Sequence, residues 1–171
     1  ARANIIANTG SAGKTSLKNL IKDLLKYFGK THFSPRSFNN HLGVPISLSN
    51  LSYEDKFGVF EVGMSNSGEI RNLTSLIKPE IGIITNIGEA HMENFKNING
   101  IAKAKSEMIE NIKIGGTIIL NRDDKFFNYL YKKAKKYKLN VTTFGKHKKS
   151  DVRIEKIINQ KNNSKVIIKI K

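Results

Sequence analysis

The chain has 171 residues, of which 39% are hydrophobic, so it can bury one substantial core and is not a disordered segment. It contains no Cys, which excludes a disulfide framework, a thiolate metal site and a cysteine nucleophile. No apolar run approaches about 18 residues and no signal peptide is recognisable, so we expect one soluble, cytoplasmic domain without a membrane span.

The net charge of +16 is typical of nucleic-acid-binding proteins. The distribution of the charge argues against that function, because residues 122–171 hold 16 basic and 4 acidic residues, a net charge of +12, and most of the basic residues are Lys. Enrichment in Lys and Asn also follows from an AT-rich genome. A basic module at residues 122–171 that binds RNA or another polyanion is kept as an alternative.

Apolar runs alternate with helical periodicity, which predicts an α/β fold with a mostly parallel sheet between helical layers. We expect parallel strands at 4–8, 57–62, 81–86, 117–120 and 141–144, and helices at 17–28, 69–77, 98–112 and 126–137. The runs at 152–158 and 165–170 predict a C-terminal antiparallel hairpin.

The first helix has apolar residues spaced three or four apart, with Gly29 as the expected C-cap. These apolar residues are Leu17, Leu20, Ile21, Leu24, Leu25 and Phe28. Lys18, Lys22 and Lys26 fall on the opposite face, and we interpret them as solvent-exposed.

A candidate phosphate-binding loop, T-G-S-A-G-K-T, lies between the first strand and the first helix. Glycines let backbone N–H groups approach an anion, and the helix N-terminus adds its dipole. The nucleotide contacts predicted here are Gly10, Ser11, Ala12, Gly13, Lys14, Thr15 and Ser16. Asn8 stands where the G-x-x-x-x-G-K-[ST] pattern has Gly, and a Gly/Ser turn capped by Thr15 is the simpler alternative.

Glu61 is a single carboxylate near the C-terminal end of the apolar strand at 57–62. A buried carboxylate is costly unless it is paired or binds a metal, and ligands of α/β sheets bind at this edge. Glu61 is therefore a candidate Mg²⁺ ligand, and a structural salt bridge is the alternative.

Lys105 lies at the centre of the apolar stripe of the helix predicted at 98–112. An ammonium group there needs a counter-charge, a chemical modification or an extended path to solvent. His91 follows the third strand and either coordinates a metal or lies in a loop without a role.

Eight short motifs, in this order, resemble those of the Mur ligases, the ATP-dependent amide-forming enzymes of peptidoglycan synthesis. They are residues 9–15, 39–45 (NNHLGVP), 61–64 (EVGM), 68–70 (GEI), 85–86, 90–91, 104–107 (AKSE) and 121–124 (NRDD). The resemblance spans about residues 5–145 and implies the central ATP-binding domain of a three-domain enzyme. The family's N-terminal UDP-substrate domain and C-terminal domain would be absent, so we expect a poor ligase in isolation.

The resemblance also implies roles for individual residues. Lys14 resembles the lysine that contacts the γ-phosphate, and Thr15 and Glu61 resemble ligands of one Mg²⁺ ion. His91 resembles a ligand of a second Mg²⁺ ion. Lys105 matches a lysine that many Mur ligases carbamylate, and the carbamate would support that second metal.

Stretches 39–45 and 61–70 look like the family member that adds D-alanyl-D-alanine to UDP-MurNAc-tripeptide. In that reaction the peptide carboxylate attacks the γ-phosphate of ATP, and the dipeptide amine then attacks the acyl phosphate. Asn40 would lie near the phosphates of UDP-MurNAc-peptide, and Asn86 beside the second metal. Another Mur-type ligase, such as a folylpolyglutamate synthase, and a catalytically silent domain are the remaining alternatives.

Overall fold

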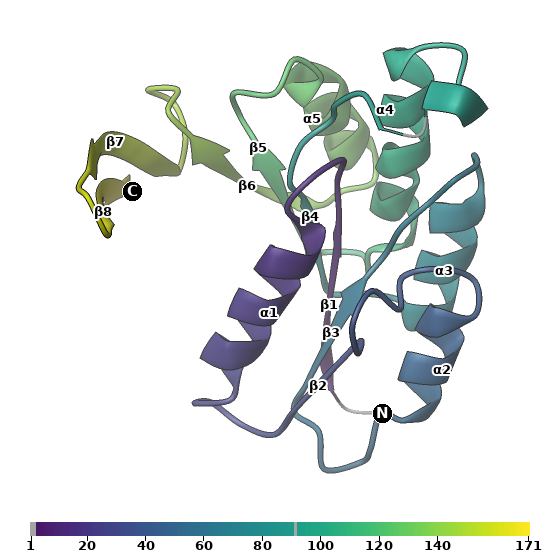
Figure 1. Cartoon of the computed structure of the whole chain (residues 1–171). Coiled ribbons are helices and arrows are strands. Elements are labelled where there is room, and N and C mark those ends of the chain that lie inside the picture. The colour runs from purple at the N-terminus through teal and green to yellow at the C-terminus, as the bar shows by residue number, and fades with distance from the viewer. Residues whose placement is uncertain (1–2, 91) are drawn as a thin grey trace.

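The computed structural model describes residues 3–90 and 92–171 and contains one eight-stranded sheet with the order β2-β3-β1-β4-β5-β6-β7-β8 (Figure 1). The strands are β1 (Asn4–Thr9), β2 (Thr31–Phe33), β3 (Phe57–Glu61), β4 (Ile81–Ile84), β5 (Thr117–Asn121), β6 (Asn140–Gly145), β7 (Val152–Asn159) and β8 (Ser164–Ile170). The helices are α1 (Lys14–Leu25), α2 (Gly43–Ser49), α3 (Glu69–Ile77), α4 (Ile98–Ser106) and α5 (Phe127–Lys136), with 3-10 turns η1 (Met92–Asn94) and η2 (Glu107–Asn111).

The strand directions confirm the predicted α/β class. All neighbouring strands from β2 to β7 pair in parallel, and β7 and β8 form the expected antiparallel hairpin. The short elements β2 and α2 were not predicted, because three and seven residues carry too little periodicity. The helix predicted at 98–112 is divided into α4 and η2.

The helices cover the two faces of the sheet unequally (Figure 1). Of the helices in the described part of the chain, α1 alone lies on one face, where Leu17, Ile21 and Leu25 pack over a small cluster that includes Ile6 and Val59. The other helices cover the opposite face and enclose the larger core, which contains Phe60, Ile70, Ile84, Ile101, Met108, Leu120 and Leu130. Among the described residues, no helix combines the length and apolar character needed to cross a membrane.

The predicted solvent-exposed face of α1 is wrong at Lys18, which is only 1% exposed, whereas Leu20 and Leu24 are 68% and 61% exposed. The helix contacts the sheet through one narrow row of residues, Leu17, Ile21 and Leu25. Lys18 adjoins this row and therefore faces β3 rather than solvent. α1 also ends earlier than predicted, with Lys26 rather than Gly29 as its C-cap.

The carboxyl ends of β3, β1 and β4 lie side by side, because β1 pairs with both neighbours in parallel. The two strands that follow β1 in the chain, β2 and β3, lie on one side of β1 in the sheet. The next strand in the chain, β4, lies on the other side of β1. Such a reversal opens a crevice at the carboxyl ends of the strands, where α/β proteins bind ligands. In β1 and β3, Asn8 stands opposite Glu61 at this edge.

Candidate active site

The loop after β1 has the backbone of an anion cradle. Gly10 and Gly13 have φ values of +154° and +80°, and α1 begins at Lys14 directly after Gly13. A Cβ atom at Gly10 would lie 1.8 Å from Thr85 Oγ1, so the close approach requires glycine. Lys14 Nζ folds back and donates to the Gly10 carbonyl at 2.8 Å. The loop therefore presents backbone N–H groups and a lysine at a helix N-terminus.

The segment after β4 supports this loop. Asn86 Oδ1 accepts a hydrogen bond from the Ala12 N–H at 3.0 Å, and the Asn86 carbonyl accepts one from the Ser11 N–H at 3.0 Å. The Thr85 hydroxyl donates to the Ala12 carbonyl at 2.7 Å. Asn86 thus reaches the predicted site, and here its side chain holds the loop in shape.

Glu61 is 1% exposed and both of its carboxylate oxygens accept hydrogen bonds. Oε2 accepts from the Thr15 hydroxyl at 2.8 Å, and Oε1 accepts from Asn39 Nδ2 at 2.7 Å. The first contact joins the end of β3 to the first turn of α1. It brings together the two residues predicted to bind one Mg²⁺ ion.

The donor set at this point fits Mg²⁺. A hydroxyl and a carboxylate are oxygen ligands, which Mg²⁺ prefers, and Mg²⁺ is usually held by one or two carboxylates together with phosphates and water. Within residues 3–90 and 92–171, no group of three or more His, Cys, Asp or Glu side chains could hold a metal ion. Thr15 and Glu61 therefore suit an ion that also takes ligands from a bound phosphate.

Lys18 is a site residue that sequence reasoning missed. Its Nζ lies 3.9 Å from Glu61 Oε2 and donates to the Arg36 carbonyl. Burial lowers the pKa of Lys18, and the charge of Glu61 opposes that shift. No local signal in the sequence identifies Lys18, because Lys22 and Lys26 follow it at the same four-residue spacing.

Asn8, the departure from the loop pattern, is completely buried beneath the loop. Its Nδ2 donates to the Lys14 carbonyl at 2.8 Å, while its Oδ1 has no hydrogen-bond partner among the described residues. The amide thus supports the first turn of α1.

Lys105 is 2% exposed, which confirms the inward position predicted from the apolar stripe. It lines a cavity of about 230 Å³ with Lys14, Asn39, Asn40, Gly63, Met64, Ser65 and Glu69. Burial, reinforced by the charge of Lys14, lowers the pKa of Lys105 to about 8. An amine with this pKa is partly neutral near physiological pH.

Glu107 fixes the end of α4, and with it the backbone near Lys105. This buried carboxylate accepts hydrogen bonds from the Gly68 N–H at 2.8 Å and the Arg71 N–H at 3.1 Å. Both donors belong to the start of α3, where a negative charge is favourable. Glu107 therefore ties α4 to α3 beside the cavity.

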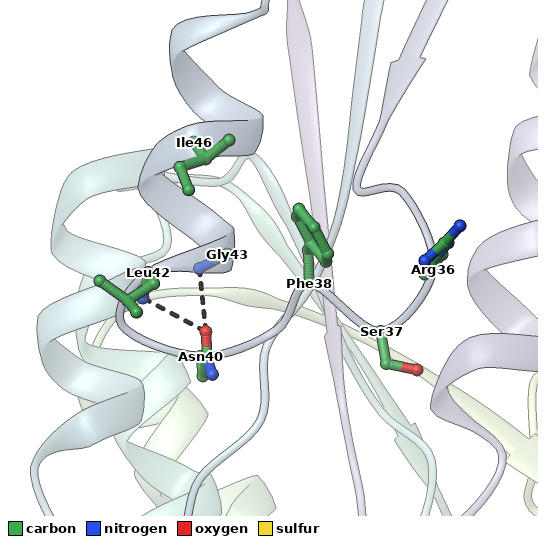
Figure 2. A pocket seen from close by; sticks show the side chains of 7 residues that line it. All are labelled: Arg36, Ser37, Phe38, Asn40, Leu42, Gly43 and Ile46. Atoms are coloured by element: carbon green, nitrogen blue, oxygen red, sulfur yellow. Dashed lines mark hydrogen bonds between the residues drawn. The ribbon is translucent and has the colours of Figure 1, made fainter.

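Asn40 lies between this cavity and a larger one of about 560 Å³, shown in Figure 2. The larger cavity is lined by Arg36, Ser37, Phe38, Asn40, Leu42, Gly43 and Ile46. Asn40 Oδ1 accepts hydrogen bonds from the Leu42 N–H at 3.2 Å and the Gly43 N–H at 2.9 Å. Its oxygen therefore shapes the start of α2.

Comparison with known proteins places this site in a family. The family model "Mur ligase middle domain" matches residues 9–171. This chain belongs to the Mur ligase family. The predicted resemblance is thereby confirmed.

Several relatives of this Mur ligase domain carry the same name. UDP-N-acetylmuramoyl-tripeptide--D-alanyl-D-alanine ligase from Buchnera aphidicola is 38% identical over 150 residues, which are 88% of this chain and 33% of that protein. The enzyme of that name from Rickettsia prowazekii is 36% identical over 154 residues, 90% of this chain and 34% of that protein. The chain thus spans about a third of the length of these relatives.

Solved Mur ligase structures agree with the fold. MurF from Acinetobacter baumannii has a TM-score of 0.93 and 30% identity, covering 99% of this chain and 37% of that one. MurF from Thermotoga maritima, solved in complex with ADP, has a TM-score of 0.88 and 26% identity, covering 98% and 38%. A folylpolyglutamate synthase mutant from L. casei, at 15% identity and a TM-score of 0.71, shares the fold alone.

The Mur ligase site brings together most of the predicted residues. The loop from Gly10 to Thr15 meets Glu61 and Asn86, and Lys14 shares a cavity with Lys105 and Asn40. Ser16 is exposed on the first turn of α1. His91 lies outside the described residues.

Proposed function

We propose that this chain is the ATP- and Mg²⁺-binding domain of a cytoplasmic ligase that makes amide bonds in peptidoglycan precursors. The observation that carries the proposal is the 2.8 Å hydrogen bond from the Thr15 hydroxyl to Glu61 at the mouth of the phosphate loop. It joins a nucleotide-binding element to a buried carboxylate at the crevice of the sheet. The ADP complex of the Thermotoga maritima relative supports nucleotide binding.

The finer part of the proposal concerns the substrates, and it rests on the names of the relatives. They are ligases of UDP-N-acetylmuramoyl-tripeptide and D-alanyl-D-alanine. The smaller cavity, of about 230 Å³, is lined by both Lys14 and Asn40 and offers room for an acceptor next to the phosphate loop. The larger cavity shares Asn40 with it and would extend that room away from the loop. Flanking domains of the same enzyme would hold the UDP group and the incoming dipeptide.

In the proposed reaction, the terminal carboxylate of the UDP-linked peptide attacks the γ-phosphorus of ATP, and ADP leaves. The dipeptide amine then attacks the carbonyl of the acyl phosphate, loses a proton and displaces phosphate. Lys14 would release the Gly10 carbonyl and place its ammonium against the β- and γ-phosphates. Bound Mg²⁺, held by Thr15 and Glu61, would offset the negative charge of the phosphates and carboxylate.

Lys105 has a separate proposed role. Its neutral amine would attack the carbon of CO₂ and lose a proton, which leaves a carbamate. Burial favours the neutral form, since it lowers the pKa of Lys105 to about 8. With His91, the carbamate would hold a second Mg²⁺ ion. A mass increase of one CO₂ on the intact chain that is lost in Lys105→Met would support the modification.

Thermal unfolding with and without Mg·ATP tests the proposed function. A ligand that binds only the folded state at 100 times its Kd stabilises it by about 2.7 kcal/mol, so Tm should rise measurably. Lys14→Ala should remove the rise. Lys26→Ala, on the half-exposed end of the same helix, is the matched control and should keep it. An equal rise in the Lys14→Ala variant would overturn the proposal.

A further inference from the structure

A small basic pocket lies at the base of the β7–β8 hairpin. It has a volume of about 110 Å³ and is lined by Lys148, Ser150, Arg153, Lys169 and Lys171. β7 is four strands from β1 in the sheet, a separation of about 19 Å at the usual strand spacing of about 4.8 Å. The pocket is therefore separate from the phosphate loop.

The cations of this pocket are brought together by the fold. Arg153 and Lys169 stand directly opposite each other in the antiparallel ladder, a placement that is unfavourable for like charges. Glu155 contacts Arg153, which offsets one of the positive charges. The carboxylate of Asp151 accepts hydrogen bonds from the backbone and hydroxyl of Thr143, and it interacts with the charge of Lys171. The pocket keeps an excess of positive charge.

The buried hydroxyl of Ser150 is a second, independent indication of a ligand in this pocket. It is 1% exposed, and its Oγ has no hydrogen-bond partner among residues 3–90 and 92–171. A buried hydroxyl without a partner is unfavourable, so such groups usually meet a ligand or an ordered water. The turn that carries Ser150 is itself fixed, because the Ser150 N–H donates to the His147 carbonyl at 2.9 Å.

We propose that this pocket binds a single phosphate group. A tetrahedral oxyanion would accept charge-assisted hydrogen bonds from Arg153 and Lys169 and a hydrogen bond from the Ser150 hydroxyl. It would also relieve the repulsion between the opposed cations. Free inorganic phosphate and the phosphate monoester of a nucleotide share this chemistry.

A compact site is favoured over an extended polyanion surface. The lining residues converge from the 146–150 turn and from β7 and β8 on one small volume. Lys161 and Lys165, at the distal end of the hairpin, do not line it. These two lysines provide a control with the same loss of charge.

The test is titration of the ¹⁵N-labelled full chain at constant ionic strength, followed by NMR. One arm uses inorganic phosphate and the other uses AMP. We expect saturable shifts at amides of residues 148–153 and 169–171, unchanged in Lys14→Ala. Saturation by inorganic phosphate would identify the free anion as the ligand of the pocket. Saturation by AMP alone would identify a phosphate monoester as the ligand.

Three variants distinguish a specific binding site from diffuse electrostatic attraction. Arg153→Gln/Lys169→Gln should raise Kd by about tenfold or more, whereas Lys161→Gln/Lys165→Gln should leave Kd within about twofold. Ser150→Ala should weaken binding about threefold without a change in charge. Non-saturable shifts, an equal loss in both double variants, or binding of an oligonucleotide but of neither small anion would overturn the proposal.

Discussion

Lys18 Nζ lies 3.9 Å from Glu61 Oε2, and each side chain is only 1% exposed. The same ammonium donates to the Arg36 carbonyl, and the other oxygen of Glu61 accepts from Asn39. Lys18 and Glu61 therefore join α1 and β3 to the segment that lines the cavity of Figure 2. Glu61 and Lys18 thus connect Thr15 of the phosphate loop to Arg36 of this cavity through a chain of polar contacts.

Lys18→Met should lower the free energy of unfolding by about 1–3 kcal/mol, because Glu61 loses its cation and the Arg36 carbonyl loses its donor. Lys18→Arg keeps the charge and should recover part of the loss. Lys26→Met, on the exposed end of the same helix, should change stability by less than about 0.5 kcal/mol. Urea denaturation measures all three, and equal stabilities of Lys18→Met and Lys26→Met would contradict a role for the pair.

Gly10→Ala should destabilise the domain more than Gly13→Ala. A Cβ atom at Gly10 meets Thr85 Oγ1 at 1.8 Å, and moving that hydroxyl breaks its hydrogen bond to Ala12. At Gly13 no atom lies within 4 Å, so only the left-handed backbone is penalised, by about 1–2 kcal/mol. Denaturant unfolding compares the two variants. Partial recovery of Gly10→Ala by Thr85→Ala is expected, and its absence would argue against this clash.

The buried amine of Lys105 should make stability depend on pH. Its pKa is about 8 in the folded chain against 10.5 ordinarily, so between these values the unfolded chain binds the extra proton. Wild-type stability should therefore rise with pH across this window, relative to Lys105→Met, by about 1–2 kcal/mol from pH 7 to 9.5. Urea unfolding in CO₂-free buffer measures the difference, with Lys103→Met as the exposed control. A pH-independent difference would contradict the burial of a charged amine.

Local patterns in the sequence were sufficient to predict much of the candidate site. The strand, loop and helix around Lys14 follow one another within a short segment, and α3 has the bounds predicted for it, Glu69–Ile77. Glu61 and Lys105 could be singled out because each interrupts an apolar pattern, and both side chains are buried in the structure. Such interruptions are visible without knowledge of the tertiary structure.

The remaining features depend on packing between distant segments. Lys18 follows the same helical spacing as the exposed Lys26, and only its orientation toward β3 distinguishes the two. Asn39 reaches Glu61 from a loop 22 residues earlier in the chain. The contact between Asn86 and Ala12 likewise joins segments that only the parallel pairing of β1 and β4 brings together.

A crystal structure of this chain with Mg²⁺ and a non-hydrolysable ATP analogue tests the central claim most directly. We predict that the γ-phosphate lies against Lys14 Nζ, which has left the Gly10 carbonyl, and that Thr15 and Glu61 share one Mg²⁺ ion directly or through water. Nucleotide bound elsewhere, or a loop-bound triphosphate whose Mg²⁺ has no contact with Thr15 or Glu61, would contradict the account.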